Sequence, residues 1–513
     1  MQKPLWGERN ATDVVLHNDV ASRIMRAPVR LRTQGRLGTY RGEGQIIAIA
    51  DTGLDTGDLR TMSPAFAGRI DQLFAWGRKN PDRTDDPHGH GTHVAGSALG
   101  SYRTPTGGWI NGTAPEARLV MQSTATQAGG VHIPDDITEF FQQAYDAGAR
   151  IHSNSWGFAF HGQQDPYTDD ARNIDRFVHD HPGMVILVAA GNAGKDADGD
   201  GVVDSSSIIG PAACKNCITV GASESIRNNS ITWGGQSPLG FPVQPLRGDA
   251  IADSSRGMSA TSSRGPTREG RIKPDVVAPG TSILSVHSRN AQHRHVADGV
   301  SVDPNLTYMS GTSMATPLTA GSAAVLREIL VKSNHPNPSA ALIKGVLING
   351  ARPLAGQYDP SETGATPNNN SGFGRVDLQR SAEAVYADAT DSGFHDHVQG
   401  LRRGDSYRMN VEIPRNRPRG STLKATLVWT DPPGPDLMSD LDLRIHHAGK
   451  AKARNGNSGT SARYDRVNNV EQVTWTNPPR GTLEIKVAAH RVHGHAQPFA
   501  LVWSFHMPHR RGQ

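Results

Sequence analysis

The sequence predicts an α/β protein in which a parallel β-sheet carries helices on both faces and is followed by a small antiparallel β-sandwich or jelly-roll-like barrel. Three observations predict this fold class. Short apolar runs recur along the first two-thirds of the chain, helix patterns lie between them, and alternating strands replace both after about residue 390. The 56 glycines and 33 prolines indicate many turns rather than long helical bundles.

The apolar runs are short and continuous, which is typical of strands buried on both faces of a parallel sheet. They cover residues 45–50, 119–121, 150–154 and 184–188. Three polar residues follow these runs, namely Asp51, Ser155 and Asn192. Because chemistry in open parallel sheets collects at the carboxyl ends of the strands, we expect these three residues to lie near a functional site.

A helix is predicted between the second and third runs. Ile137, Phe140 and Ala144 would fall on one face of this helix, Asp135 can cap its beginning, and Gly148 ends it.

The end of the chain has a different pattern. Turn residues separate alternating strands, which is typical of an antiparallel sandwich or barrel. The predicted strands cover residues 422–429, 441–445, 470–475, 482–487 and 499–505. We therefore divide the chain into an N-terminal extension at 1–17, interpreted as a possible propeptide remnant, a catalytic-type α/β domain at 18–390 and a β-domain at 391–513.

Composition excludes several classes of partner. The formal net charge of the 513-residue chain is +4, and its basic residues are scattered among prolines and glycines, so no nucleic-acid partner is expected. No apolar run approaches the length of about 20 residues that spans a bilayer, so we expect no membrane span. No motif indicates an organic cofactor, and we expect a monomer.

Three short motifs carry the chemistry. They are Asp51-Thr52-Gly53, the heptapeptide that begins at His90, and the segment Gly311-Thr312-Ser313 with the four residues after it. A serine hydroxyl becomes a nucleophile when a base takes its proton and a third group orients that base. The motifs supply a carboxylate, an imidazole and a hydroxyl in the order Asp, His, Ser, which is the order of the subtilisin triad.

On these motifs, and on the tetrapeptide that ends at Asn192, the chain resembles the subtilases (peptidase S8 family), and most closely the alkaline proteases that carry a C-terminal β-barrel. The resemblance runs from about Asn18 to the end of the chain. It implies a serine endopeptidase with protein or peptide substrates, with Asp51, His90 and Ser313 as catalytic residues and His93 as a structural neighbour.

The same resemblance implies the remaining site residues. Asn192 would donate a hydrogen bond to the oxyanion of the transition state. An edge strand with Ser155, Trp156 and Gly157 would hold an extended peptide by main-chain pairing. The primary specificity pocket would be lined by Ala189, Ala190 and Gly191.

Other reaction classes fit the motifs less well. The Gly-x-Ser-x-Gly elbow of an α/β-hydrolase is absent around Ser313, because Ala315 stands at the second position after it. A sedolisin would carry Glu in place of His90 and Asp in place of Asn192. Two alternatives remain open, namely a catalytically inactive, peptide-binding relative of the subtilases and an esterase with the same chemistry.

Two acidic groups suggest structural calcium. Asp196, Asp198, Asp200 and Asp204 with Gly201 copy the beginning of a calcium-binding loop, although no EF-hand helices flank it. An unliganded acidic loop is the alternative. In the second domain, Asp431, Asp440 and Asp442, with Asp465 and Glu471, resemble calcium positions in related barrels, and turn capping is the alternative there.

The two cysteines, Cys214 and Cys217, form a Cys-x-x-Cys pair. Such a pair can be a redox motif, half of a zinc site, two buried thiols or a local disulfide, and we favour the last two because no second pair is present. The resemblance implies secretion. Residues 1–6 lack the pattern of a signal peptide, so the alternatives are an intracellular protein or an incomplete chain.

Overall fold

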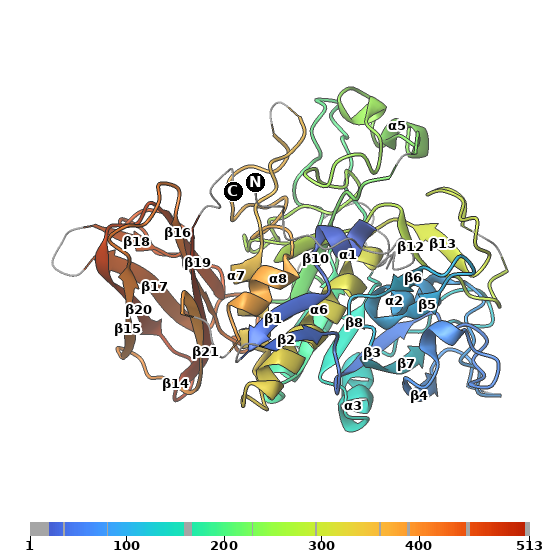
Figure 1. Cartoon of the computed structure of the whole chain (residues 1–513), viewed down its shortest axis with the longest axis horizontal. Helices are drawn as coiled ribbons and strands as arrows, with labels where there is room; N and C mark the ends of the chain where they lie inside the picture. The colour runs from blue at the N-terminus through green and yellow to red at the C-terminus, as the bar shows by residue number, and fades with distance from the viewer. Residues whose placement is uncertain are drawn as a thin grey trace, which may run out of the picture.

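The computed structural model describes residues 20–33, 36–79, 81–157, 167–227, 229–292, 295–358, 361–386, 390–447 and 452–507. The predicted extension at 1–17 lies outside these residues. Two bodies lie side by side, an α/β body and a β-sandwich, with α7 (Ala340–Gly350) between them (Figure 1). No helix in the described part of the chain combines the length and apolarity that a membrane crossing requires.

The α/β body is built on one seven-stranded parallel sheet. In sheet order its strands are β11 (Val276–Pro279), β10 (Ile218–Ser223), β9 (Val185–Ala189), β8 (Ile151–Asn154), β3 (Ile46–Asp51), β7 (Arg118–Ser123) and β4 (Ile70–Ala75). Residues of β8, β9 and β10 are buried along their whole lengths, and β9 is accordingly a continuous apolar run, whereas β8 also buries the polar residues His152, Ser153 and Asn154.

Helices cover this sheet and connect its strands. Two of them, α2 (His90–Leu99) and α6 (Thr312–Lys332), pack against each other and on the sheet. Two others, α3 (Thr138–Asp146) and α4 (Asp169–Asp180), contact each other, and α4 contacts β9. The shorter helices are α1 (Val20–Ile24), α5 (Trp233–Gln236), α8 (Leu378–Glu383), and the 3₁₀ turns η1 (Pro64–Phe66) and η2 (Leu246–Gly248).

The prediction that Asp135 caps α3 is wrong, because the residue at the N-cap is Ile137, which makes no side-chain capping hydrogen bond. Asp136, and not Asp135, accepts hydrogen bonds from the backbone N–H and the hydroxyl of Thr138, at 3.0 and 2.8 Å. The adjacent acidic residues gave the sequence no means of choosing between them.

Three two-stranded antiparallel ribbons flank the main sheet. They are β1 (Val29–Thr33) with β2 (Arg36–Tyr40), β5 (Ser101–Arg103) with β6 (Trp109–Asn111), and β12 (Ile283–Val286) with β13 (Leu306–Met309).

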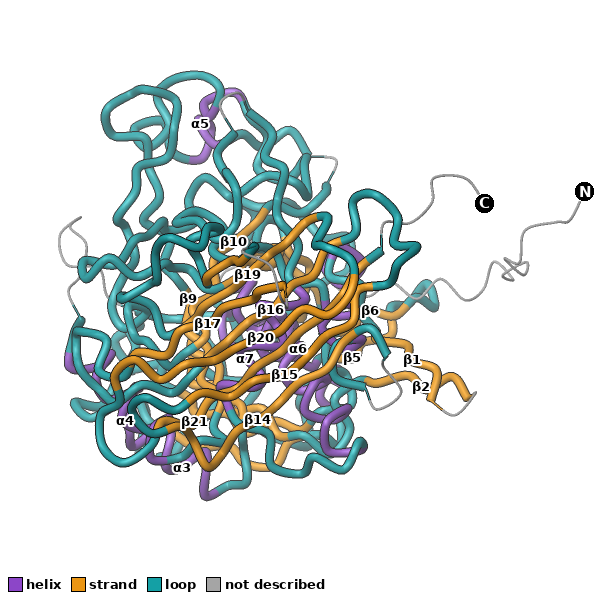
Figure 2. Tube along the Cα trace, turned by 90° about the vertical axis from the view of Figure 1, so that its left-hand side faces the viewer, coloured by secondary structure: helices purple, strands orange, loops and turns teal. Residues whose placement is uncertain are grey.

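The C-terminal body consists of two four-stranded antiparallel sheets (Figure 2). One sheet orders β14 (Ser392–Leu401), β21 (Gln497–His506), β16 (Thr422–Val428) and β19 (Val470–Thr476). The other orders β15 (Ser406–Ile413), β20 (Gly481–Arg491), β17 (Asp440–His447) and β18 (Ala453–Asn455). A separate apolar core fills the sandwich, with Leu427, Leu443 and Ile485 fully buried. The expected fold class, a parallel α/β sheet followed by antiparallel sheets, is confirmed.

The two bodies share a packed interface. Helix α7 contacts β16 and β21, and Val428 and Val502 belong to the same buried cluster as the core of the α/β body. Asn349 of α7 donates to the Thr426 hydroxyl at 3.1 Å and accepts from the Ser504 hydroxyl at 2.7 Å. The sandwich is therefore docked on the α/β body by both apolar and polar contacts.

Candidate active site

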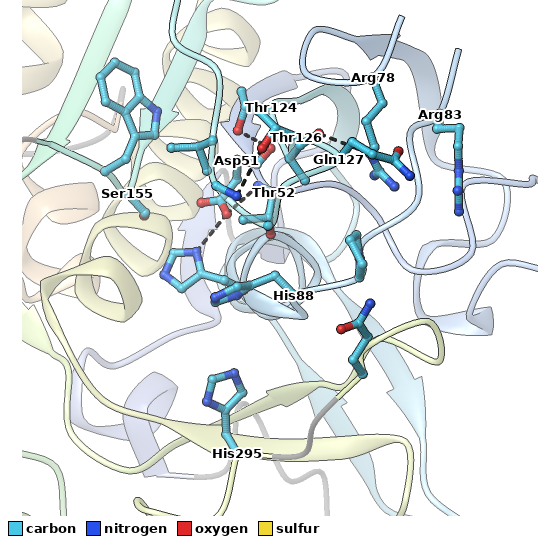
Figure 3. Close-up of a pocket in the computed structure, with 18 residues that line it drawn as sticks. Asp51, Thr52, Arg78, Arg83, His88, Thr124, Thr126, Gln127, Ser155 and His295 are labelled. Atoms are coloured by element: carbon cyan, nitrogen blue, oxygen red, sulfur yellow. Dashed lines mark hydrogen bonds and ion pairs between the residues drawn. The ribbon is translucent and has the colours of Figure 1, made fainter. Parts of the chain in front are cut away.

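Asp51 and His90 meet at the carboxyl end of the parallel sheet. Asp51 is the last residue of β3 and His90 is the first residue of α2. Asp51 Oδ1 accepts a hydrogen bond from His90 Nδ1 at 2.7 Å and another from the Thr52 backbone N–H at 2.8 Å. The pair lines a cavity of about 600 Å³, and Figure 3 shows Asp51 among its labelled residues. The sequence prediction that these two motifs converge is therefore met by the geometry.

Glycines allow this convergence. A Cβ on Gly91 would lie 2.4 Å from the backbone oxygen of Gly53, which is far inside van der Waals contact. Only glycine at position 91 lets the start of α2 approach the loop after β3 so closely.

Asp86 organises the start of α2, and the sequence analysis missed it. Its buried carboxylate accepts from the Gly89 backbone N–H at 2.8 Å and from the Thr92 backbone N–H at 2.8 Å. It also accepts from the hydroxyls of Thr52 and Thr92, at 2.8 and 2.7 Å. One carboxylate thus satisfies open donors at the N-terminus of α2 and links that helix to the loop after Asp51. An acidic residue four positions before His90 was the available signal.

The surroundings of His90 suit a base. Burial works to lower its pKa, but the Asp51 carboxylate, through charge and a hydrogen bond, and the charge of Asp86 outweigh this effect and raise the pKa above the ordinary 6.5. With Nδ1 donating to Asp51, the Nε2 atom of neutral His90 is an acceptor.

His93, the competing histidine of the same helix, is fully buried. Its Nε2 atom donates to the Ile283 carbonyl at 2.9 Å, and burial lowers its pKa to about 3. His93 is therefore a neutral, structural hydrogen-bond donor and cannot exchange protons with a substrate.

Ser313 is the second residue of α6, where backbone N–H groups at the helix N-terminus favour negative charge. Its hydroxyl donates to the Ser155 carbonyl at 3.0 Å, and the Ser155 hydroxyl donates to the Ser313 carbonyl at 2.9 Å. Because Ser155 lines the same cavity as Asp51 and His90, this reciprocal pair puts Ser313 at the edge of that cavity. In this arrangement the hydroxyl's hydrogen-bond acceptor among the described residues is Ser155, and not His90.

Pro317 lies inside α6, at its sixth residue. Proline has no N–H, so the carbonyl four residues earlier loses its helical donor. That carbonyl belongs to Ser313, and it is the one that receives the Ser155 hydroxyl. The proline thus frees an acceptor on the candidate nucleophile, and Ser155 fills it.

Asn192 is anchored beside Ser313 through its side-chain oxygen. Its Oδ1 atom accepts from the Thr312 backbone N–H at 2.8 Å and from the Thr312 hydroxyl at 3.0 Å. Because the oxygen is committed to Thr312, the Nδ2 amide is the end of the side chain that can donate to a bound group. This is the orientation that an oxyanion donor requires.

The segments 155–157 and 189–191 lie on two sides of a residue that the sequence analysis did not single out, Ile209. A Cβ on Gly157 would lie 2.8 Å from Ile209 Cδ1, and a Cβ on Gly191 would lie 2.8 Å from Ile209 Cγ1. The Ile209 backbone N–H donates to the Ala190 carbonyl at 3.3 Å. The side chain of Ile209 therefore occupies space between the two segments. Its position 17 residues after Asn192 gave no local signal.

Trp156 lines the cavity and is hydrogen-bonded to the backbone of β3. Its indole N–H donates at 3.1 Å to the carbonyl of Ala50, the residue before Asp51. This bond ties the predicted substrate-binding segment to the strand that carries the candidate acid.

The acidic loop after Asn192 gathers three carboxylates. Ligand oxygens of Asp196, Asp198 and Asp200 lie within 4.8 Å of one another, and this is the only such group of three acidic, histidine or cysteine side chains among the residues that the structure describes. Asp196 is buried and also accepts from the Asp200 and Gly201 backbone N–H groups. Asp204 accepts from the Ala197 N–H at 3.0 Å and closes the loop.

The second acidic group is used differently. Asp431 is fully buried and pairs with Lys215 at 2.6 Å, while Asp440 and Asp442 both pair with Arg466. Asp431 thus has a cation of its own, whereas Asp440 and Asp442 share the single cation of Arg466. Calcium binding by this group stays a prediction.

Cys214 and Cys217 form a disulfide, so the local covalent link is the form present here. Both cysteines are fully buried. The two residues between them, Lys215 and Asn216, contact the sandwich, because Asn216 Nδ2 donates to the Asp431 carbonyl at 2.8 Å.

Comparisons with known proteins identify the family to which the chain is similar. The family model described as the subtilase family matches residues 42–374. The serine protease/ABC transporter B family protein tagB of Dictyostelium discoideum is 28% identical over 579 residues, which cover 90% of this chain and 30% of that protein. The chain thus spans about a third of that relative's length.

Two bacterial relatives match a smaller share of the chain. Serine protease AprX of Bacillus subtilis is 31% identical over 324 residues, covering 61% of this chain and 62% of that protein. The thermophilic serine proteinase of Bacillus sp. strain AK1 is 29% identical over 288 residues, covering 56% and 53%.

Proposed function

Because the chain belongs to the subtilase family, whose curated relatives are serine proteases, we propose that it is a serine endopeptidase that hydrolyses peptide bonds through an acyl-enzyme. The observation that carries the proposal is the 2.7 Å hydrogen bond between His90 Nδ1 and Asp51 Oδ1 at the edge of the cavity. This bond fixes the tautomer in which Nε2 can accept a proton.

In the first half of the reaction, Ser313 Oγ attacks the carbonyl carbon of the scissile bond. For this step the hydroxyl turns from the Ser155 carbonyl toward His90, whose Nε2 atom takes its proton. The carbonyl oxygen becomes an oxyanion, and the Asn192 amide and the Ser313 backbone N–H donate to it. Cleavage of the C–N bond then releases the amine with the proton from His90.

Water completes the cycle. His90 takes a proton from water, the resulting hydroxide attacks the ester carbon, and His90 returns the proton to Ser313 as the acid product leaves. Asp51 keeps the imidazolium oriented in both halves and does not itself take up the proton.

Fluorophosphonate labelling tests the proposal. The wild-type chain is expected to be labelled at Ser313 and to cleave an unfolded protein, whereas the Ser313→Ala variant should do neither. A wild type that resists labelling would favour the inactive, peptide-binding alternative. Turnover of matched peptide and ester substrates separates an endopeptidase from an esterase, since an esterase would hydrolyse only the ester.

We further propose that Asp196, Asp198 and Asp200 bind a calcium ion that stabilises the loop after Asn192. Their oxygens are close enough to share one ion, and carboxylate oxygens are the ligands that calcium prefers. Calcium should raise the melting temperature of the Ser313→Ala chain, because an ion that binds only the folded state stabilises it, by about 2.7 kcal/mol at 100 times its Kd. Equal melting with calcium and with chelator would reject this site, and the Asp198→Ala/Asp200→Ala variant is the matched control.

A further inference from the structure

A second pocket, of about 620 Å³, has walls from both bodies of the molecule, and we refer to it as the interface pocket. The α/β body contributes Arg26, just after α1, Arg352, just after α7, and Arg380 of α8. The sandwich contributes Lys424 of β16 and His506 of β21. Figure 1 shows α7 and α8 at the side of the α/β body that faces the sandwich. The lining is therefore rich in basic side chains, and the proposed hydrolysis uses none of them.

One face of a sheet forms the sandwich wall of the interface pocket. Thr422 and Lys424 are two residues apart on β16, so their side chains point to the same face. On β19, Thr476 is paired with Thr422 and Thr474 with Lys424, and on β21 His506 is paired with Thr422. Paired residues of an antiparallel sheet share a face. This wall therefore presents hydroxyl, ammonium and imidazole groups to the pocket together.

The wall from the α/β body has more cations than carboxylates. Arg26 and Arg352 both pair with Asp377, so two guanidinium groups share one carboxylate. The guanidinium of Arg380 makes no hydrogen bond or ion pair with any residue in the described ranges, although its backbone N–H donates to Asp377 at 3.1 Å. Glu383 is the one acidic residue of the described lining. With the lysine of the other wall, four cations face two carboxylates, which leaves an excess of up to two positive charges.

Two buried side chains of the interface pocket have unused hydrogen-bonding atoms. Lys424 is 5% exposed, and its ammonium donates to the Ala351 carbonyl at 2.9 Å, with no carboxylate at ion-pair distance among the residues that the structure describes. His506 Nε2 is buried and has no hydrogen-bond partner in that part of the chain. Buried polar groups are nearly always hydrogen-bonded, so such an atom requires a ligand, an ion or a water molecule that uses it.

The cations are close enough to influence one another's protonation. Burial, followed by the charge of Arg380, lowers the pKa of Lys424 to about 7. Burial, followed by the charges of Arg380 and Lys424, lowers the pKa of His506 to about 3. A negative charge among these groups would offset the repulsion, because it favours their charged forms.

We propose that the interface pocket binds a small phosphate-type anion, such as pyrophosphate or a phosphorylated small molecule, and that both bodies hold it. The free donors belong to guanidinium and ammonium groups, which form strong charge-assisted hydrogen bonds to phosphate oxygens. A phosphoryl group brings nearly two negative charges and three acceptor oxygens, which matches the excess charge, whereas a carboxylate brings one charge. The anion connects Arg380 of the α/β body with Lys424 of the sandwich and so strengthens their docking.

Calorimetric titration with sodium pyrophosphate, on the Ser313→Ala chain at constant ionic strength, tests the site. Chelator is present throughout, so that pyrophosphate cannot act by removing calcium. Arg380→Gln and Lys424→Met, one from each body, should each weaken binding at least about tenfold, because each removes a charged donor. Arg172→Gln, on the exposed surface of α4, removes the same charge and should bind as the parent does. Unchanged affinity in either Arg380→Gln or Lys424→Met would overturn the shared site.

Thermal melting gives a second measurement on the same chains. Pyrophosphate should raise the melting temperature of the parent and of Arg172→Gln, and should raise that of Arg380→Gln and Lys424→Met less, because an ion stabilises the folded state in proportion to its affinity for it. Malonate, a dicarboxylate, should bind the parent at least about tenfold more weakly than pyrophosphate, and equal binding would reject the phosphate class. No binding heat and no change in melting at millimolar pyrophosphate would overturn the proposal as a whole.

Discussion

Two short hydrogen-bonded pairs of side chains in this protein have opposite characters. His90 and Asp51 meet at 2.7 Å in the cavity, and Lys215 and Asp431 meet at 2.6 Å between the two bodies. The His90 side chain is 23% exposed, whereas Lys215 and Asp431 are completely buried. The distances do not distinguish the two pairs. The difference lies in how many hydrogen-bond donors and acceptors of each pair still lack a partner.

The interface pair is saturated. The three N–H donors of the Lys215 ammonium reach Asp431 Oδ2 and the carbonyls of Pro432 and Asp436, at 2.6, 2.7 and 2.9 Å. Asp431 in turn accepts from the backbone N–H groups of Met438 and Ser439. Because all three donors of Lys215 have partners, the Lys215–Asp431 pair connects the two bodies and has no free donor for a substrate.

The Asp51–His90 pair in the cavity retains atoms that can form further hydrogen bonds. Within the described part of the chain, Asp51 Oδ2 is buried without a hydrogen-bond partner. His90 lines the cavity and bonds to Asp51 through Nδ1, which leaves Nε2 outside that bond. A buried polar group without a hydrogen bond lowers the stability of the fold, and proteins retain such groups mainly at functional sites. This contrast predicts which substitutions change chemistry and which change only folding.

Asp51→Asn should have the largest effect, with kcat lowered about 10⁴-fold. The amide can donate to His90 Nδ1, which would favour the tautomer with the proton on Nε2 and remove the base. The variant should melt close to the wild type, since the side chain keeps its shape. Peptide turnover and thermal melting check both parts. A loss of activity that tracks a loss of folding would contradict the assignment.

Lys215→Met should destabilise the folded chain by about 3–5 kcal/mol, because it leaves the buried Asp431 carboxylate without its cation. Activity per folded molecule should change little, in contrast to Asp51→Asn. Denaturant unfolding measures the stability. The double variant Lys215→Met/Asp431→Leu should recover part of the loss, since it removes the stranded charge, and no recovery would mean that the pair is not the cause.

Asn192→Ala should lower kcat about 10²–10³-fold with little change in KM, because its amide acts on the charge that develops in the transition state. The Thr312 groups that Asn192 accepts from would lose their partner, so melting is measured beside the kinetics. An equal rise in KM would indicate a role in substrate binding instead.

The sequence predicted the fold class because the class depends on local patterns, namely short apolar runs, helix patterns between them and alternating strands after them. The meeting of Asp51 with His90 was expected from the resemblance of their motifs to those of the subtilases. The sequence could not predict the partner of Asp431, because Lys215 lies 216 residues earlier and only the docking of the sandwich brings them together. Nor could it place Pro317 in the helix, since the freed Ser313 carbonyl is tolerated only because Ser155, which directly follows β8, supplies a donor.

The pH dependence tests the electrostatics of the cavity pair. His90 must be neutral to accept a proton, and its pKa is raised, so kcat/KM should fall about tenfold per pH unit below a midpoint that lies above 6.5. Asp86→Asn removes one of the charges that raise this pKa, so the midpoint should move to lower pH. An unchanged midpoint in a folded variant would show that Asp86 acts only on the helix.

Ile209→Gly should have the smallest effect and should act on specificity. In the wild type the isoleucine packs against the Cα positions of Gly157 and Gly191, the segments expected to line the primary pocket, so small side chains should be preferred before the cleaved bond. Removing it opens that space. The ratio of kcat/KM for substrates with Phe and with Ala at this position should rise roughly tenfold or more, since burial of a few methylene groups is worth about 1–3 kcal/mol.

The pH midpoint of the Ile209→Gly variant is the control. It should equal that of the wild type, because Ile209 makes no described hydrogen bond to Asp51 or His90. A ratio that does not move would place the specificity pocket elsewhere on the cavity, and a shifted midpoint would mean that the pocket and the cavity pair are coupled.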